Sequence, residues 1–249
     1  MLDRLQGVVT GCKIGSQLFT AAGPTAIELA HRRGFRVFLD LKFHDIPNTV
    51  AGAVREATRS GVFMLNVHAS GGLAMMRAAA ESATKAAAEF KIVRPVCIGV
   101  TVLTSLDRRA LDHEVGVARS VEAHVLHLAD RAREAGLDGC VASPQEIGVL
   151  RRALGPSWVI VTPGIRGRSN QAGRSAGPGD SASPGRSAGP GGSGGHVGAP
   201  RSNDDQVRVA TPAAALRAGA DYLVIGRPIT AAPDPVTAAR AILDELRVG

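Results

Sequence analysis

The sequence is poor in aromatic residues, and its positive charge is not gathered in any one place. Phe, Trp and Tyr make up 3% of the 249 residues, and the basic residues behind the net charge of +7 alternate with acids, as in Arg131–Glu134. Proteins that bind nucleic acid cluster Lys and Arg along the phosphate backbone and stack bases on aromatic rings. The composition therefore argues against a nucleic-acid partner.

Cysteines are also few, and long apolar runs are missing. Cys12, Cys97 and Cys140 lie far apart in apolar segments, without the spacing of a metal site or a disulfide framework, so we expect buried free thiols. The chain has no run of about 18 apolar residues and no charged-then-apolar leader. We therefore expect no membrane span and no signal peptide, and we predict a cytoplasmic protein.

Lysine is the scarcest of the charged side chains. Only four of the 29 basic residues are lysines, namely Lys13, Lys42, Lys85 and Lys91. A chain that nearly always uses Arg keeps Lys where a compact, titratable ammonium matters. Lys85 and Lys91 have the setting of surface residues at a helix end, which leaves Lys13 and Lys42 as candidates for chemistry.

Strand-like and helix-like segments alternate along the whole chain. The expected strands are continuous apolar runs, typical of parallel sheets covered on both faces, at residues 12–19 (with an exit loop), 36–43, 62–68, 95–103, 139–143, 158–162 and 222–226. Helical patterns span residues 1–8, 24–31, 48–60, 72–90, 120–135, 144–154, 211–218 and 235–246. This βα repeat predicts an α/β protein with one TIM (β/α)8 barrel domain over residues 1–249, whose first strand is missing from the chain.

A low-complexity segment interrupts the repeat at residues 167–204. It consists of Gly, Ser, Pro, Ala and Arg, and Gly173–Gly179 recurs unchanged at Gly185–Gly191. Such a composition cannot bury enough apolar surface to fold by itself. We interpret it as a loop insertion within the barrel domain, with a basic lid that closes over phosphate as the alternative.

Polar residues recur where the expected strands end. They are Lys13, Asp40, Lys42, Asn66, His68, Thr104, Ser105, Ser143, Arg166, Gly226 and Arg227. In an α/β barrel the carboxyl ends of the strands form the active-site face, and the loops after the last two strands commonly bind phosphate. Arg166 and the pair Gly226–Arg227 would supply a guanidinium and backbone N–H groups for a phosphate there.

The pattern D-x-K-x-x-D stands out among these residues. Asp40 and Lys42 are two apart on one strand and so share a face, while Asp45 follows the strand just before Pro47. With Lys13 they would form an alternating network of charges in the barrel mouth. Buried charges are costly unless fully paired, so the set favours a functional site over a structural ion-pair layer, which is the alternative.

Seven motifs resemble those of the orotidine 5′-phosphate decarboxylase family of the bacterial type. They are Phe38–Thr49 (FLDLKFHDIPNT), Lys13–Gly15 (KIG), Met64–Gly72 (MLNVHASGG), Val100–Ser105 (VTVLTS), Thr162–Arg166 (TPGIR), Asp205–Val209 (DQVRV) and Leu223–Ile229 (LVIGRPI). Because they occur in order and cover nearly the whole chain outside the low-complexity segment, the resemblance is specific. It implies decarboxylation of orotidine 5′-phosphate to uridine 5′-phosphate in pyrimidine biosynthesis.

The resemblance also implies a role for each charged residue. Lys42 would donate the proton to C6 of the pyrimidine after carbon dioxide leaves, and Asp40 would crowd the substrate carboxylate. Lys13 and Asp45 would complete the charge network. In this family the second aspartate comes from the other subunit, so Asp45 implies a homodimer with shared sites.

The implied substrate site is larger than the charge set. It comprises Lys13, Asp40, Leu41, Lys42, Phe43, His44, Asp45, Ile46, Pro47, Asn48, Thr49, Thr104, Ser105, Arg166, Gln206, Gly226 and Arg227. Thr104, with Ser105, would contact the pyrimidine ring of the nucleoside monophosphate. Arg166, Gln206, Gly226 and Arg227 would hold its phosphate, and neither a metal nor an organic cofactor is implied.

The chain departs from the family at two places. The family's first strand, with an Ala-Leu-Asp motif whose aspartate contacts the ribose, has no counterpart here, and the low-complexity segment falls between Arg166 and Gln206. Two alternatives remain open. One is a magnesium-dependent sugar-phosphate decarboxylase or synthase of the same barrel group, and the other is an inactive barrel that binds a phosphorylated ligand.

Overall fold

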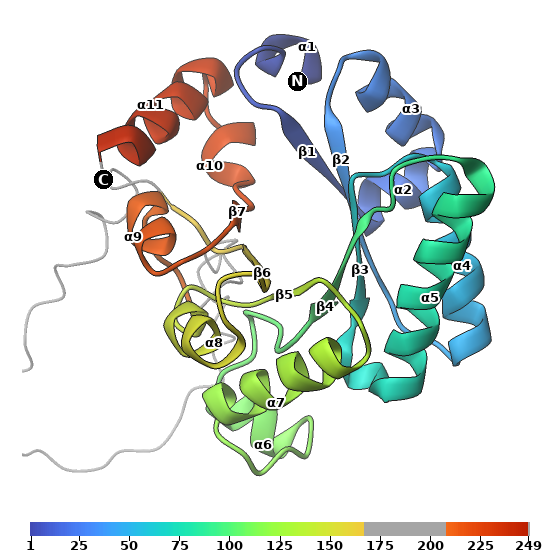
Figure 1. Cartoon of the computed structure of the whole chain (residues 1–249). Helices are drawn as coiled ribbons and strands as arrows, with labels where there is room; N and C mark the ends of the chain where they lie inside the picture. The colour runs from blue at the N-terminus through green and yellow to red at the C-terminus, as the bar shows by residue number, and fades with distance from the viewer. Residues whose placement is uncertain (167–207, 249) are drawn as a thin grey trace, which may run out of the picture.

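The computed structural model describes residues 1–166 and 208–248, and their strands form one curled parallel sheet (Figure 1). The strands are β1 (Gly11–Gly15), β2 (Arg36–Phe43), β3 (Met64–His68), β4 (Val96–Val100), β5 (Gly139–Val141), β6 (Val159–Thr162) and β7 (Tyr222–Leu223). They are hydrogen-bonded in sequence order from β1 to β7, and every pair is parallel. The seven predicted strands and their parallel pairing are confirmed.

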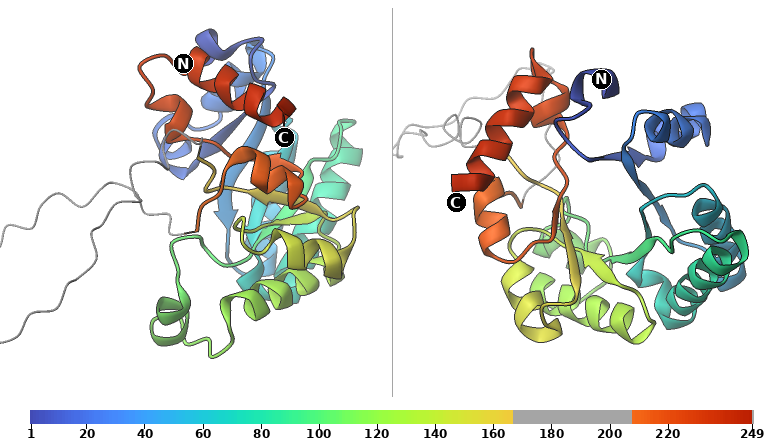
Figure 2. Two further views of the ribbon diagram at one scale, coloured as in Figure 1. Left: turned by 90° about the vertical axis from the view of Figure 1, so that its left-hand side faces the viewer. Right: turned by 45° about the horizontal axis from the view of Figure 1, so that its top comes forward.

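The helices lie outside the curl of the sheet (Figures 1 and 2). Because all strand pairs are parallel, the carboxyl ends of the strands lie at one common face. They are α1 (Leu2–Leu5), α2 (Ser16–Ala22), α3 (Thr25–Arg32), α4 (Pro47–Arg59), α5 (Gly72–Phe90), α6 (Arg108–His113), α7 (Val121–Glu134), α8 (Ile147–Leu154), α9 (Pro212–Arg217), α10 (Arg227–Thr230) and α11 (Pro235–Val248), with the 3-10 turn η1 (Ala69–Gly71) before α5. This alternation places the fold in the TIM-barrel class of α/β proteins.

The helices start where the sequence provides a suitable first residue. Asp107, Ser120 and Thr211 each accept a hydrogen bond from the backbone N–H three residues on, which caps α6, α7 and α9. Pro47 opens α4, where its fixed φ suits the first helical position and its missing N–H is not needed. These helix starts therefore follow from local chemistry.

Two apolar layers hold the strands in place. The larger core lies between the sheet and the helices, and the alanines of α5 bury a face made of small side chains there. The smaller cluster, built on Met64, Ile98 and Val161, is made of side chains that alternate along the strands with those of the larger core, so it lies on the inner face of the sheet. Alternate residues of the strands therefore serve two cores, which explains why the strands are apolar throughout.

The sheet is open between its first and last strands. In the described ranges 1–166 and 208–248, β1 pairs only with β2 and β7 only with β6. The Arg4 guanidinium reaches Asp234 over 2.9 Å, which joins α1 to the start of α11 near this opening (Figure 2). The described strands thus form a TIM-barrel-like sheet of seven strands in place of the closed eight-stranded barrel that the fold class predicts.

The predicted insertion at residues 167–204 lies outside the described residues, so its prediction is untested. No helix in the described part of the chain is long and apolar enough to cross a membrane.

Candidate active site

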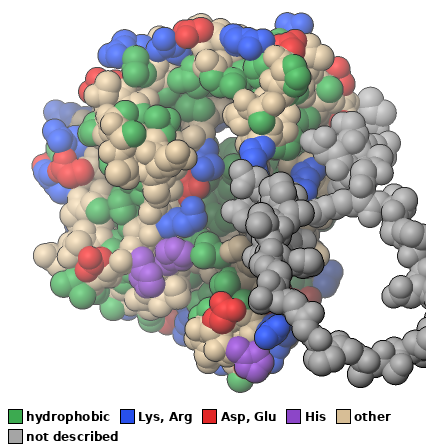
Figure 3. Space-filling model, turned by 180° about the vertical axis from the view of Figure 1, so that it is seen from behind, with side chains coloured by type: hydrophobic (Ala, Val, Ile, Leu, Met, Phe, Trp, Pro, Cys, Tyr) green, Lys and Arg blue, Asp and Glu red, His purple; other side chains and the backbone are tan. Residues whose placement is uncertain are grey.

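A cavity of about 990 Å³ opens at the carboxyl ends of the strands. The predicted site residues that line it are Lys13, Asp40, Lys42, Thr104, Arg166, Gly226 and Arg227. Figure 3 shows this hollowed face, with Lys and Arg side chains around the depression. The predicted convergence of strand ends is confirmed in part: β1, β2, β4, β5 and β6 and the segment directly after β7 contribute to one cavity. The cavity lining does not include Asn66, His68, Ser105 or Ser143.

Asp40 lies between two lysines on one side of the cavity. Its Oδ2 is 3.0 Å from Lys13 Nζ, and its Oδ1 is 2.6 Å from Lys42 Nζ. Burial by itself would raise the pKa of Asp40, but the charge of Lys13 and the hydrogen bonds from Lys42 and Asn66 outweigh it, so the pKa lies below its ordinary value of 3.8. Asp40 is therefore an anion whose two oxygens are both engaged by cations.

Gly15 leaves the space that the Lys13 ammonium uses. A Cβ at this position would lie 3.2 Å from Lys13 Nζ, closer than most side-chain atoms approach one another. The glycine of the Lys13–Gly15 motif thus keeps the outer end of β1 open for the lysine. This steric requirement explains the glycine at position 15, for which the sequence analysis gave no physical reason.

Asn66 is a site residue that the sequence analysis placed at a strand end without giving it a role. It is fully buried on β3, its Nδ2 donates to Asp40 Oδ1 over 2.7 Å, and its Oδ1 accepts from the Lys42 backbone N–H over 2.8 Å. One amide thereby fixes both members of the Asp40–Lys42 pair. A polar residue inside an otherwise apolar strand was the available signal.

The backbone of Lys42 adopts an unusual conformation. Its φ is +53°, in the left-handed region that non-glycine residues rarely occupy, and the register of β2 against β3 shifts between Leu39 and Phe43. Such a conformation costs on the order of 1–3 kcal/mol and persists only where neighbouring contacts impose it. Here the Asn66 side chain supplies one such contact by accepting the Lys42 N–H.

The other predicted site residues around Lys42, between Leu41 and Thr49, do not line the cavity. Leu41 and Phe43 pack against the larger core, and Pro47, Asn48 and Thr49 form the exposed first turn of α4. Ile46 is 67% exposed. These residues position the loop, and their predicted contacts with substrate stay predictions.

Asp45 lies in the same exposed loop, apart from the two lysines. Its Oδ1 accepts from the Ile46 backbone N–H over 2.6 Å. Among the described residues of this single chain, the lysines of the charge set are joined by Asp40 alone. The predicted four-membered network therefore contains three members within one chain, and the part assigned to Asp45 stays a prediction.

Two histidines flank the lysine side of the site. The rings of His44 and His68 are 5.3 Å apart between centroids, and His68 ends β3. Burial, followed by the charges of His44 and Lys42, lowers the pKa of His68 below its ordinary value of 6.5. His68 therefore adds no positive charge to the site near neutral pH.

The arginine side of the cavity is built from the ends of β6 and β7. Arg166 is fixed through its backbone N–H, which donates to Ala210 O over 3.0 Å, and Gly226–Arg227 lead into α10. Thr104 lies on the cavity wall between the two sides, whereas Ser105 is exposed in the adjoining turn. Gln206 lies outside the described residues, so its predicted phosphate contact is untested.

The sheet is TIM-barrel-like, with lysines and an aspartate at one side of its mouth and arginines after the last strands. This arrangement is typical of barrel enzymes that act on small phosphorylated substrates. The sequence model described as "Orotidine 5'-phosphate decarboxylase / HUMPS family" matches residues 1–188 and 193–242. The chain belongs to this family.

Individual relatives agree with the family match. "Orotidine 5'-phosphate decarboxylase" of Moorella thermoacetica is 54% identical over 248 residues, which are 100% of this chain and 86% of that protein. The protein of the same name from Pelobacter propionicus is 46% identical over 252 residues, covering 100% and 90% of the two chains. The crystal structure of orotidine 5'-phosphate decarboxylase from Lactobacillus acidophilus superposes with a TM-score of 0.72 at 32% identity, over 94% of this chain and 85% of that one.

Proposed function

We propose that Lys42 is the proton donor in the decarboxylation of orotidine 5′-phosphate to uridine 5′-phosphate. This activity is a carboxy-lyase reaction in pyrimidine biosynthesis, and relatives named orotidine 5'-phosphate decarboxylase that match the whole chain support it. The bond between C6 and the carboxylate breaks, carbon dioxide leaves, and the electron pair stays on C6, where the Lys42 ammonium delivers a proton. The observation that carries the proposal is Asp40 held at 2.6 Å from Lys42 Nζ and 3.0 Å from Lys13 Nζ.

The charges of the site favour the transition state over the bound substrate. Asp40 places a negative charge near the substrate carboxylate, a repulsion that ends when carbon dioxide departs. The Lys42 ammonium lies where negative charge develops on C6, and a fixed cation stabilises that charge without any rearrangement of solvent. Asp40 and Asn66 hold the side chain and the backbone of Lys42, so the proton donor is placed before substrate arrives.

The phosphate binds at the opposite side of the cavity in this proposal. Arg166 and Arg227 provide guanidinium groups, and Gly226 provides close backbone approach, in the loops after β6 and β7. Binding energy from a group that does not react can be used to orient the pyrimidine over Lys42. Gln206 is proposed as a further phosphate ligand.

The activity is tested by following ultraviolet absorbance when purified protein is mixed with orotidine 5′-phosphate. We expect absorbance to fall as the conjugated carboxylate is lost, and we expect uridine 5′-phosphate in equal amount to the carbon dioxide released. Tight binding of uridine 5′-phosphate without turnover would instead favour an inactive barrel that binds phosphorylated ligands.

A magnesium-dependent sugar-phosphate decarboxylase or synthase is the second candidate, because the matching family description names two groups. That reading predicts that a chelator abolishes activity and that magnesium restores it. Orotidine 5′-phosphate decarboxylation through Lys42 predicts full activity in the presence of the chelator. The full-chain identities of 46% and 54% to named decarboxylases support the nucleotide substrate.

We further propose that the working barrel has an eighth strand between β7 and β1. Both strands have an unpaired edge among the described residues, and such edges tend to pair with any strand available. A variant with a designed strand-forming segment fused before Met1 should melt at a higher temperature and turn over faster if that segment pairs with both edges. An unchanged melting temperature would count against this proposal.

The low-complexity segment is proposed to be an insertion that catalysis does not need. The support is its internal repeat, Gly173–Gly179 and Gly185–Gly191. A chain without residues 173–191 should keep its turnover, whereas a large increase in KM would favour a lid that acts on phosphate.

A further inference from the structure

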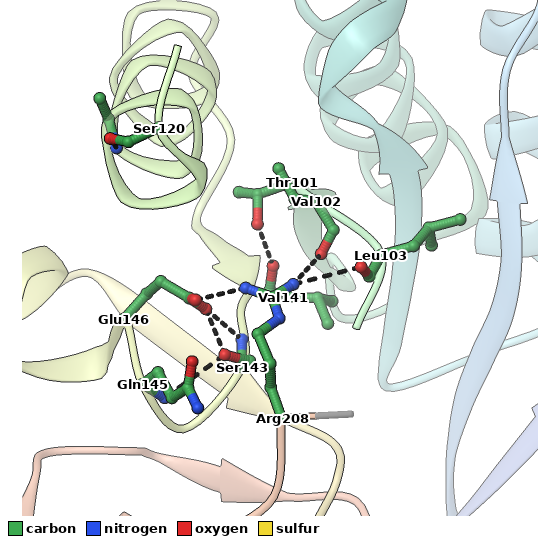
Figure 4. Close-up of polar contacts among 10 residues, drawn as sticks. Thr101, Val102, Leu103, Ser120, Val141, Ser143, Gln145, Glu146 and Arg208 are labelled. Carbon is green, nitrogen blue, oxygen red and sulfur yellow. Dashed lines mark hydrogen bonds and ion pairs between the residues drawn. The ribbon is translucent and has the colours of Figure 1, made fainter. Parts of the chain in front are cut away.

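Arg208 and Glu146 form a buried ion pair beneath the cavity wall, and neither residue has a role in the proposed reaction (Figure 4). Arg208 is 6% exposed and Glu146 is 3% exposed, and Arg208 Nη1 bonds Glu146 Oε1. Removing two charges from water carries a penalty that their attraction often fails to recover, so a buried pair is weak evidence for stability. The contacts around the pair suggest what it does instead.

The guanidinium holds the loop after β4 through two carbonyl groups. Arg208 Nη2 donates to Leu103 O over 3.2 Å and to Val102 O over 3.4 Å. Val102, Leu103 and Thr104 are consecutive in the cavity wall, and Thr104 is the residue assigned to the pyrimidine ring. The position of Thr104 in the cavity thus depends on carbonyls that Arg208 fixes.

The carboxylate holds the turn after β5 in the same way. Glu146 Oε2 accepts from the Ser143 backbone N–H over 2.9 Å and also from the Ser143 hydroxyl. Ala142, directly before this turn, lines the cavity beside Val141. One ion pair therefore ties together the ends of two neighbouring strands, as Figure 4 shows.

The phosphate side of the cavity is held by different bonds. Ala210 N donates to Gly164 O over 3.2 Å, and Arg166 N donates to Ala210 O over 3.0 Å. These backbone bonds do not use the Arg208 side chain. Loss of that side chain should therefore disturb the pyrimidine wall and leave the arginine wall in place.

We infer that the Arg208–Glu146 pair is a positioning device that sets the pyrimidine-contacting wall of the cavity, and so selects for the base of the bound nucleotide. This inference rests on the proposed function in that it assigns Thr104 to the ring. The fork of a guanidinium reaches a carboxylate and two carbonyls at once, which a lysine ammonium on a flexible stem cannot reproduce.

The test compares two ligands by calorimetry, uridine 5′-phosphate and ribose 5-phosphate, which lacks the base. Displacing Thr104 should cost the contacts that it makes with the base, so for Arg208→Met we expect uridine 5′-phosphate to bind ~10-fold more weakly. We expect ribose 5-phosphate to bind within about twofold of the unaltered protein, since the arginine wall is unchanged. Arg208→Lys should fall between the two proteins.

The matched control is Arg151→Met. Arg151 is also a partly buried arginine with carbonyl contacts, to Gly155, Trp158 and Gly219, and an ion pair with Asp221, but these residues precede β6 and β7 at the opposite end of the sheet. Its loss should lower the melting temperature and leave the ratio of the two affinities unchanged. Glu146→Gln, which keeps an acceptor for Ser143, serves where Arg208→Met fails to fold.

Equal weakening of both ligands in the Arg208 and Glu146 variants, or no change in either, would overturn the inference. Because the readout is binding, it can be judged even if the unaltered protein releases no carbon dioxide from orotidine 5′-phosphate. Failure of turnover would then count against the proposed function alone.

Discussion

Lys42 and Asn66 are joined by a hydrogen bond in which the Lys42 backbone N–H donates to Asn66 Oδ1 over 2.8 Å. The other end of the same amide donates to Asp40 Oδ1 over 2.7 Å. The two bonds together fix the orientation of the Asn66 amide and hold Lys42 at a φ of +53°. The proposed proton donor is therefore positioned by a residue that never contacts the substrate carboxylate or C6 in the proposed reaction.

Replacing Asn66 tests this relationship. Asn66→Ala removes both bonds and leaves Asp40 and a strained backbone less constrained, so we expect a loss of about 1–3 kcal/mol in the free energy of unfolding. We also expect kcat to fall about a hundredfold with a smaller change in KM, because the position of Lys42 changes more than the binding surface. Chemical denaturation and steady-state kinetics measure the two effects.

Asn66→Asp is the matching variant of similar size. It keeps an acceptor for the Lys42 N–H but places a second carboxylate beside Asp40, which raises the pKa of one of the two. Activity should then decline at a higher pH than in the unaltered protein as the pH is lowered. Identical pH profiles would show that Asn66 does not act on the charge of Asp40.

Removing the ammonium of Lys42 should abolish turnover while the ligand still binds. Proton donation by a positioned group contributes about 10²–10⁴-fold, so Lys42→Ala should lose at least about a thousandfold in kcat once the electrostatic loss is added. Uridine 5′-phosphate should still bind, as measured by calorimetry. Lys85→Ala, at an exposed lysine on α5 paired with Glu81, is the control and should retain full activity.

The stability of the protein should fall as the pH drops below the ordinary value of 6.5 for histidine. The pKa of His68 is lowered by burial and by the charges of His44 and Lys42, so the unfolded chain binds a proton that the folded chain does not. This stability is present above 6.5 and is lost as the pH falls toward the lowered pKa. The lowered pKa of Asp40 adds a second loss below 3.8.

Denaturation of His68→Gln at a series of pH values checks this expectation. The variant should show a shallower decline just below pH 6.5 than the unaltered protein, with the steeper loss below 3.8 retained. His113→Gln, at the exposed end of α6, is the control. An equal slope in all three proteins would show that His68 does not contribute.

The strands could be predicted from the sequence because both of their faces are buried. Successive residues are then all apolar, and each strand is visible as an unbroken apolar run. β2 was predicted at residues 36–43 and occurs at Arg36–Phe43, and α5 was predicted at 72–90 and occurs at Gly72–Phe90. It also predicted that Lys13, Asp40 and Lys42 converge, since side chains two apart on a strand share a face and parallel strand ends meet at one edge.

Other features depend on contacts between distant segments. The left-handed φ of Lys42 and the register shift of β2 carry no local signal, because neither Gly nor Asn stands at that position. The Arg208–Glu146 pair joins residues 62 positions apart and falls within a motif that was read only for family likeness. The pattern D-x-K-x-x-D did not show that Asp45 lies apart from the lysines, because the loop at Ile46 turns it toward its own backbone.

Arg227 is expected to bind the phosphate, so the effect of replacing Arg227 should depend on whether the substrate carries a phosphate. A hydrogen bond to a charged partner contributes about 1.5–3 kcal/mol, so Arg227→Ala should lower kcat/KM for orotidine 5′-phosphate at least about tenfold. Turnover of the nucleoside orotidine, which has no phosphate, should not change. Arg240→Ala on the exposed face of α11 is the control, and a loss with both substrates would place Arg227 elsewhere in the mechanism.

The exposed position of Asp45 leads to a test of shared sites. If Asp45 completes the site of a partner subunit, Lys42→Ala and Asp45→Asn each inactivate a homodimer, but a hybrid dimer contains one site with both original residues. Random mixing makes half of the dimers hybrids with one intact site of two, so the mixture should recover about a quarter of the original activity. Steady-state rates after mixing, refolding and dilution measure the recovery.

Mixing Lys42→Ala with Lys13→Ala is the control, because both residues contact the Asp40 of their own chain and no hybrid site is restored. Absence of recovery in the first mixture, with hybrid dimers present, would place Asp45 outside the shared site.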